Sequence, residues 1–231
     1  MTKDPLLTIL EIFNHAVSQH PSLVAHLSKM TQSAQGDISN AQLLEWASRS
    51  YAAPAPDAVK KQVLLRNNLS NATWIETGTL FGDTSDFLSR QAMYVHTTEP
   101  DSALFEKAKQ RFHQHNNVTV HNEISEIFLP RILPTLSGNL CMWLDGHYSG
   151  GETFAGPNDT PLREELIAIQ ENITRFDNVA ILIDDIRLCG RQHAYGSYPS
   201  LGELVAFADK LELAWYIEHD IFIAKSKSTT P

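Results

Sequence analysis

Residues 73–84 read TWIETGTLFGDT, and this stretch decides how the rest of the chain is interpreted. A short run of strand-forming residues, 73–77, leads into a turn that carries Gly78 and Gly82, and a helical pattern begins at Thr84. Glycine tolerates a positive φ and lets the backbone approach a ligand closely. A strand, a glycine-bearing turn and a helix in this order form the place where a doubly wound sheet holds its cofactor loop.

Strand-like and helix-like segments alternate around this loop. Short apolar runs separated by helical patterns indicate βαβ units, and so a parallel sheet covered on both faces. The expected helices are 57–69, 84–91, 102–113, 161–174 and 200–210, and the expected strands are 73–77, 94–98, 118–120, 140–144 and 179–183. Residues 211–227 read as two more strands joined tightly at His219-Asp220, which makes them antiparallel. The sequence predicts an α/β fold: a doubly wound, mostly parallel sheet with an antiparallel C-terminal hairpin.

Residues 1–56 are expected to form a helical N-terminal cap. Apolar residues recur at helical spacing at Leu6, Leu10, Phe13 and Val17. A second helix is expected to start at Pro21 and a third to cover 40–46. The proline-bearing segment 51–56 interrupts this pattern, so the α/β domain is expected over 57–231.

Composition narrows the class of protein. The chain has 231 residues, 42% hydrophobic and 19% charged, as in an ordinary globular protein of one large domain. Its 27 acidic and 18 basic residues give a net charge of −9, which argues against nucleic acid as a partner. The N-terminal segment reads as an amphipathic helix rather than a signal peptide or membrane span, so we expect a cytoplasmic protein with no membrane partner. Cys141 and Cys189 are expected to be buried thiols.

The loop after the first strand favours a cofactor without phosphate. A dinucleotide fingerprint would need glycine where Leu80 and Asp83 stand, and the chain has no Gly-Lys-Ser/Thr phosphate loop. Asp83 and Asp86 would also oppose a pyrophosphate at the start of the following helix. S-adenosylmethionine suits this loop, because it carries a sulfonium and an ammonium. The alternative is a structural turn that needs glycine.

Glu99 ends the second expected strand, about 20 residues after Gly78. A carboxylate at this offset accepts hydrogen bonds from both ribose hydroxyls in doubly wound nucleotide sites. We therefore interpret Glu99 as a ribose-binding residue. The alternative is an acid that simply faces water.

Three aspartates follow the fourth and fifth expected strands. Asp145 comes directly after strand 140–144, and Asp184 and Asp185 come after 179–183. Carboxyl ends of parallel strands share one sheet edge, so these acids should converge and repel one another unless a cation lies among them. Hard oxygen ligands suit Mg²⁺ or a similar divalent ion. Alternatively, one aspartate caps a helix or faces water, and Arg187 neutralises another.

His147 lies two residues beyond Asp145 on the same loop. An imidazole titrates near neutral pH and can accept a proton from a substrate hydroxyl. We therefore interpret His147 as the candidate general base, and expect the remaining histidines to be solvated.

These motifs resemble the class I S-adenosylmethionine-dependent methyltransferases over residues 57–227. The resemblance is carried by the loop ETGTxxGxT at 76–84, by Glu99-Pro100, by LDGHYSGG at 144–151 and by LIDDIR at 182–187. The combination of one aspartate with an Asp-Asp pair is similar to the metal-dependent sugar O-methyltransferases of macrolide biosynthesis. The glycine-rich segment 150–157 is longer than that pattern, and residues 1–50 match no pattern that we can name.

The resemblance implies a set of site residues. Contacts to S-adenosylmethionine would come from Glu76, Thr77, Gly78, Gly82, Thr84, Glu99 and Asp145. A divalent ion would be held by Asp145, Asp184 and Asp185. His147 and Asp145 would be the catalytic pair.

The function expected from these residues is methyl transfer to a hydroxyl of a small molecule or sugar, with divalent-metal assistance. A homo-oligomer is compatible with the sequence. One alternative is a nucleotide-cofactor oxidoreductase on the same architecture, against which the incomplete glycine fingerprint argues. Another is a non-catalytic binding protein that keeps the fold, against which the acids and His147 argue.

Overall fold

The computed structural model describes residues 40–146, 160–190, 192–193 and 196–227. The chain divides into two compact units, Met1–Arg49 and Ser50–Pro231, which we describe separately. The first unit contributes one described helix, α3 (Asn40–Ser48), where a helix was predicted. The two helices expected nearer the N-terminus lie outside the described residues. No helix in the described ranges is both long and apolar enough to span a bilayer.

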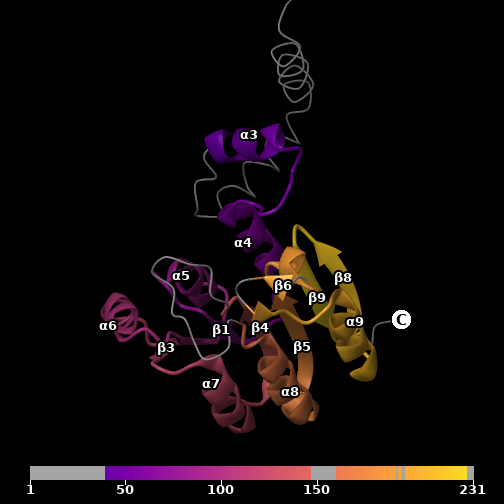
Figure 1. Ribbon diagram of the computed structural model, residues 1–231. Coiled ribbons are helices and arrows are strands. Elements are labelled where there is room, and N and C mark those ends of the chain that lie inside the picture. Colours follow the sequence, from indigo (N-terminus) through magenta and orange to yellow (C-terminus); the bar gives the residue numbers. More distant parts are fainter. Residues whose placement is uncertain (1–39, 147–159, 191, 194–195, 228–231) are drawn as a thin grey trace, which may run out of the picture. The chain divides into compact units, whose positions relative to one another are not determined.

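The second unit contains a seven-stranded sheet (Figure 1). Its strands are β1 (Thr73–Thr77), β2 (Tyr94–Thr98), β3 (Val118–His121), β4 (Gly138–Leu144), β5 (Phe176–Ile183), β8 (Ala214–Glu218) and β9 (Ile221–Lys225). The order is β3-β2-β1-β4-β5-β9-β8. The first five strands are parallel, and β9 pairs antiparallel with both β5 and β8. The predicted doubly wound, mostly parallel sheet with an antiparallel C-terminal pair is confirmed.

Helices cover both faces of this sheet. They are α4 (Asp57–Arg66), α5 (Asp83–Ser89), α6 (Ser102–Arg111), α7 (Ser125–Ile132), α8 (Leu162–Asn172) and α9 (Leu201–Lys210). Short 3₁₀ turns are η1 (Leu133–Thr135), η2 (Ile173–Arg175) and η3 (Ile186–Leu188), and a separate two-stranded pair consists of β6 (Gln192–His193) and β7 (Gly196–Ser197). Buried side chains of α7, α8 and α9 form one core with the sheet, and those of α4 and α5 form the other.

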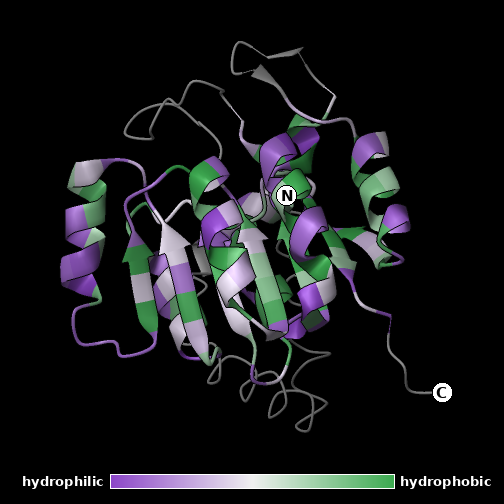
Figure 2. Ribbon diagram, turned by 90° about the horizontal axis from the view of Figure 1, so that it is seen from below, coloured by the Kyte–Doolittle hydropathy of each residue, from purple (hydrophilic) through white to green (hydrophobic). Residues whose placement is uncertain are grey.

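The central strands are buried on both faces, as parallel strands between two helical layers must be. All five residues of β1 are buried, and its side chains alternate between the two cores. Trp74 belongs to the core under α4 and α5, and Ile75 to the core under α7, α8 and α9. Figure 2 shows green residues on the strands of the sheet beside pale and purple ones, and both colours on the flanking helices.

Helix α7 is the described α-helix that was not expected from the sequence. It contains Pro130, which cannot donate a helical hydrogen bond and which hides the helical pattern. Phe128, Leu129 and Ile132 are buried against the sheet, so tertiary packing outweighs this local defect. The cysteines differ: Cys141 is buried as expected, whereas Cys189 is only half-buried, and both thiols are free.

Candidate functional site at the carboxyl edge of the sheet

The centre of the carboxyl edge lies between β1 and β4, where the strand order reverses direction. Thr77 and Leu144 are neighbours at the ends of these strands. In the turn after β1, Gly78 has a φ of +93°, and a Cβ atom built on it would lie 2.7 Å from the carbonyl oxygen of Asp145. Glycine is therefore required at this position by the approach of the β1 and β4 loops to each other, as in the structural alternative considered above. Cofactor contact by Gly78 remains a prediction.

Three other residues that were expected to contact the cofactor, Thr77, Gly82 and Thr84, lie in or beside this loop. The Asp145 N–H donates to the carbonyl oxygen of buried Thr77 over 3.2 Å. Gly82 has a φ of +82°, and a Cβ atom there would lie 2.7 Å from the ring of Phe112. Thr84 is half-buried in the first turn of α5. The first loop is thus fixed by the protein itself before any ligand is considered.

Glu76 is a carboxylate in the core, 1% exposed on β1. Its Oε2 accepts a hydrogen bond from the hydroxyl of Ser85, and Thr97 is a second neutral donor. Thr97 also shares a hydrogen bond of 2.6 Å with Thr79. Burial raises the pKa of Glu76 to about 7, the two hydroxyl donors oppose this, and the charge of Glu99 adds to it.

Glu99 links the loops that follow β1 and β2. Its Oε2 accepts from the N–H of Leu80 over 2.8 Å, and its Oε1 accepts from the N–H of Asp101 over 3.1 Å. Glu99 is buried, and burial raises its pKa while the two N–H groups oppose the shift. Each carboxylate oxygen retains a second lone pair, which a ribose hydroxyl would need. Its predicted ribose contact is compatible with this geometry.

The acids after β5 are held by two cations. The ammonium of Lys60, from α4, donates to Oδ2 of Asp184 and lies 3.7 Å from Oδ1 of Asp185. The guanidinium of Arg187 bridges Asp185 Oδ1 and Asp220 Oδ2. The alternative in which Arg187 neutralises one aspartate is therefore what the structure shows. The role of Lys60 was not anticipated, because helix α4 is far from Asp184 in sequence.

The charge states of this cluster follow from burial and pairing. Burial lowers the pKa of Lys60, but the combined attraction of Asp184, Asp145 and Asp185 outweighs it and raises that pKa. Burial raises the pKa of Asp184, Lys60 opposes the shift, and Asp185 adds to it. Oδ1 of Asp184 is buried and has no hydrogen-bond partner among the described residues. An unpaired buried carboxylate oxygen is a place for a ligand donor.

A small pocket with both polar and apolar residues in its lining includes Asp184. Its lining combines the ends of β4 and β5 with the start of α8: Leu144, Gly146, Thr160, Pro161, Leu162, Glu165, Ile183, Asp184 and Tyr198. Asp145 is half-buried next to it, at the end of β4. His147, the predicted base, and most of the glycine-rich segment after it lie outside the described residues. The structure therefore brings Asp145, Asp184 and Asp185 to one edge and leaves the position of His147 untested.

The described acids fit a divalent ion poorly. One oxygen of Asp184 and one of Asp185 already bind side-chain cations. Within the described ranges, no group of three His, Cys, Asp or Glu side chains is arranged to hold a metal. Oδ1 of Asp184 is the oxygen of these acids that is buried without a partner among the described residues, and a hard cation needs several oxygen ligands. We therefore derive no catalytic step through a metal.

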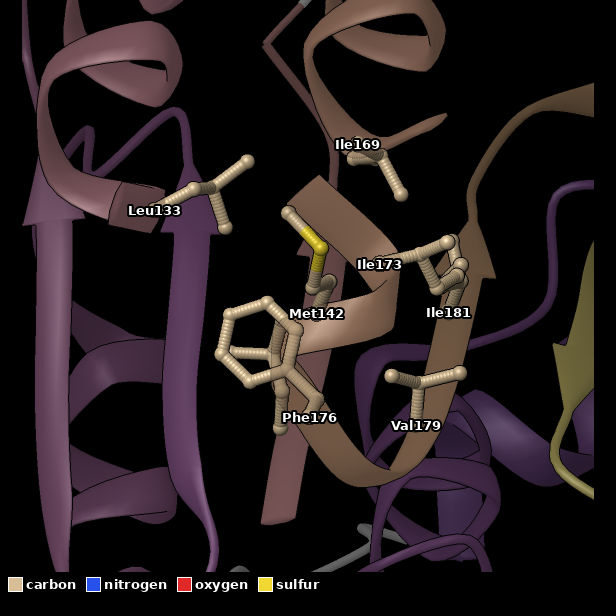
Figure 3. A pocket seen from close by; sticks show the side chains of 8 residues that line it. Leu133, Met142, Ile169, Ile173, Phe176, Val179 and Ile181 are labelled. Atoms are coloured by element: carbon tan, nitrogen blue, oxygen red, sulfur yellow. The ribbon is translucent and has the colours of Figure 1, made fainter. Parts of the chain in front are cut away.

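A second pocket is apolar and lies away from this edge (Figure 3). It is surrounded by Leu133, Leu140, Met142, Ile169, Ile173, Phe176, Val179 and Ile181. These side chains come from η1, β4, α8, η2 and β5 and belong to, or pack against, the core under α7, α8 and α9. With no polar group to orient a ligand, this pocket is a packing void rather than a functional site.

Two histidines that were expected to be solvated contact each other instead. His96 Nδ1 and His121 Nε2, on β2 and β3, are 3.3 Å apart, and Arg131 donates to the other nitrogen of His121 over 3.2 Å. Burial lowers the pKa of both rings, that of His121 to about 4. They lie on β3, the outermost strand on one side of the sheet, and on its neighbour β2, and not beside Asp145, Asp184 and Asp185.

Comparisons with known proteins give distant likenesses only. No protein-family model matches the chain, and no curated protein matches it. The N-methyltransferase NodS of Bradyrhizobium japonicum WM9 superposes with a TM-score of 0.49 at 12% identity, covering 73% of this chain and 94% of NodS. An S-adenosylmethionine-dependent methyltransferase of Aquifex aeolicus gives 0.44 at 16% identity, covering 71% and 88%. An rRNA methylase of Streptococcus thermophilus gives 0.42 at 12%, covering 75% and 95%. At these values the likeness says nothing of this chain's substrate or chemistry.

Proposed function

We propose that the chain is an S-adenosylmethionine-dependent O-methyltransferase that acts on a hydroxyl of a small molecule or sugar. The observation that carries this proposal is the excess of carboxylates at the point where the strand order reverses. Glu99 follows β2, Asp145 follows β4, and Asp184 and Asp185 follow β5. The cations described in contact with these acids are Lys60 and Arg187. Ligands of doubly wound sheets bind at this point, and negative charge there favours a cationic cofactor over a pyrophosphate.

The residues divide into three tasks. S-adenosylmethionine, when bound, supplies the methyl group. Glu76, Thr77, Gly78, Gly82, Thr84, Glu99 and Asp145 would hold the cofactor, with Glu99 accepting hydrogen bonds from ribose hydroxyls. Asp184 would orient the acceptor hydroxyl. His147 would take the proton of that hydroxyl, with Asp145 as its catalytic partner.

Calorimetry tests the cofactor assignment. S-adenosylhomocysteine should bind with a dissociation constant between about low micromolar and submillimolar, and NAD⁺ should not bind. Glu99→Gln should weaken binding by about 1–3 kcal/mol, because hydrogen bonds to a charged acceptor are lost. Glu106→Gln, an exposed site on α6, is the control and should leave the affinity unchanged. Preference for NAD⁺ would instead support the oxidoreductase alternative.

Turnover with a panel of hydroxylated metabolites tests the reaction. His147→Ala should lower the rate by roughly 10²–10⁴-fold with little change in cofactor affinity. Cofactor binding without methyl transfer to any member of a broad panel would favour the non-catalytic alternative.

Divalent-metal assistance is the competing version of this function, as the resemblance implies for Asp145, Asp184 and Asp185. In that version Asp184 must exchange Lys60 for the ion, and excess chelator abolishes turnover. In the version without metal, turnover in chelator equals turnover in Mg²⁺.

A further inference from the structure

Lys60 is a cation in the middle of the acid cluster. It comes from the second turn of α4, and its side chain is 17% exposed, while the Asp184 side chain that it contacts is 1% exposed. The other basic residue of α4 with a described ion pair is Arg66, which binds Glu218 at the surface with 51% of its side chain exposed. The chain thus places one cation of this helix in solvent and one among buried acids.

One ammonium contacts two of the three acids that the resemblance assigns to a metal and feels the charge of the third. Lys60 donates to Asp184, lies 3.7 Å from Asp185, and is held in its charged form partly by Asp145. Burying an ammonium is unfavourable unless carboxylates pair with it, and here they do. The acids therefore stabilise the buried ammonium of Lys60, and Lys60 compensates part of their negative charge.

We propose that Lys60 is the resident cation of this cluster and stands in place of a divalent ion. While Lys60 is present, Asp145, Asp184 and Asp185 do not hold a metal. The proposal concerns the cation alone and holds whether or not the chain transfers methyl groups.

Two features of the cluster support it. Oδ2 of Asp184 and Oδ1 of Asp185 both face the ammonium, so a divalent ion on the same oxygens would repel it at close range. Arg187 also binds Asp185 Oδ1, and the oxygen of this pair that is buried without a hydrogen-bond partner among the described residues is Oδ1 of Asp184. An ion that requires about six oxygen ligands gains little from one.

The same arrangement gives Asp184 a defined task. Lys60 favours the charged form of its carboxylate and binds it through Oδ2, and Asp184 lines the small pocket together with Thr160 and Tyr198. An ionised carboxylate accepts hydrogen bonds strongly. Lys60 is therefore a positioning residue for Asp184.

Manganese binding to the full chain tests the proposal. Mn²⁺ is titrated into wild type, Lys60→Met and Arg66→Met, and free Mn²⁺ is measured by electron paramagnetic resonance without cofactor or acceptor. Wild type and Arg66→Met should show no saturable site. Lys60→Met should gain one saturable site, at least about tenfold tighter than any weak wild-type binding, because it frees the acids. Adding Asp184→Asn to Lys60→Met should remove this site.

Two results would overturn the proposal. One is a stoichiometric Mn²⁺ site in wild type that Asp184→Asn abolishes. The other is a folded Lys60→Met variant, as judged by circular dichroism, that gains no site. If Lys60→Met does not fold, the wild-type titration alone decides. Since no methyl donor is present, this outcome is independent of the calorimetry and turnover results.

Discussion

The two halves of the carboxyl edge stabilise buried acids in different ways. At the ends of β1 and β2, Glu76 and Glu99 receive hydrogen bonds from hydroxyl and backbone N–H groups, and neither has a salt bridge within the described ranges. At the end of β5, Asp184 and Asp185 are held by the charged side chains of Lys60 and Arg187.

The two halves differ in how the unfavourable burial of a carboxylate charge is compensated. Neutral donors compensate a buried charge only in part, so the pKa of Glu76 rises to about 7. Burial raises the pKa of Asp184 as well, even though Lys60 opposes the shift, and removal of Lys60 would leave a buried carboxylate without its cation. We therefore expect the free energy of unfolding to change when the negative charge of Glu76 is removed from the first half. In the second half, we expect it to change when the positive charge of Lys60 is removed.

The largest expected effect is on the second half. Lys60→Met should lower the free energy of unfolding by about 3–5 kcal/mol, because Asp184 is left buried without its cation. Arg66→Met removes an ion pair of the same helix at the surface and should cost less than about 1 kcal/mol. Urea unfolding of both variants at neutral pH measures the difference. Equal costs would show that the two ion pairs are energetically alike and that this half does not depend on Lys60.

The next effect is on the first half and depends on pH. Because the folded-state pKa of Glu76 is raised from 4.5 to about 7, its contribution to stability is complete below pH 4.5 and is lost as the pH rises to 7. Glu76→Gln removes this titration. The stability of Glu76→Gln minus that of wild type should therefore grow by about 2–3 kcal/mol between pH 4.5 and 7.5. For Glu106→Gln, an exposed control, the difference should stay flat. A flat difference for Glu76→Gln as well would mean that its hydroxyl donors compensate the charge fully.

The fold was predictable from sequence because its signals are local. The turn of residues 78–82 and the alternation of apolar runs with helical patterns come from neighbouring residues, and β1, β2 and β9 formed where expected. Helix α7 was missed for a local reason too, since Pro130 disguises a segment that packing makes helical. Helix ends differ by one to a few residues from the prediction, as the cap at Pro161 before α8 illustrates.

The site was only half predictable. Asp145, Asp184 and Asp185 could be placed together because parallel strands end at one edge. Their partners could not, because Lys60 comes 124 positions before Asp184 and nothing in the pattern of α4 marks which lysine turns inward. Nor does the sequence identify Ser85 and Thr97 as the hydrogen-bond donors to Glu76, although a buried acid on a strand implies that donors exist.

The smallest expected effect concerns Gly78, where the loop after β1 approaches the loop after β4. Its φ is positive, and a Cβ would lie 2.7 Å from the carbonyl oxygen of Asp145. Gly138, the first residue of β4, also has a positive φ, of +80°, but no atom lies within 4 Å of a Cβ built there. Both alanine variants therefore carry the backbone cost, and only Gly78→Ala carries the steric one.

Gly78→Ala should thus be less stable than Gly138→Ala by about 1–2 kcal/mol, the cost of a modest steric overlap. Chemical denaturation of the two variants measures this difference without reference to any ligand. Two variants of equal stability would show that the loops after β1 and β4 move apart freely. In that case the glycine would have to be explained by a ligand, since the approach of the Asp145 carbonyl would no longer require it.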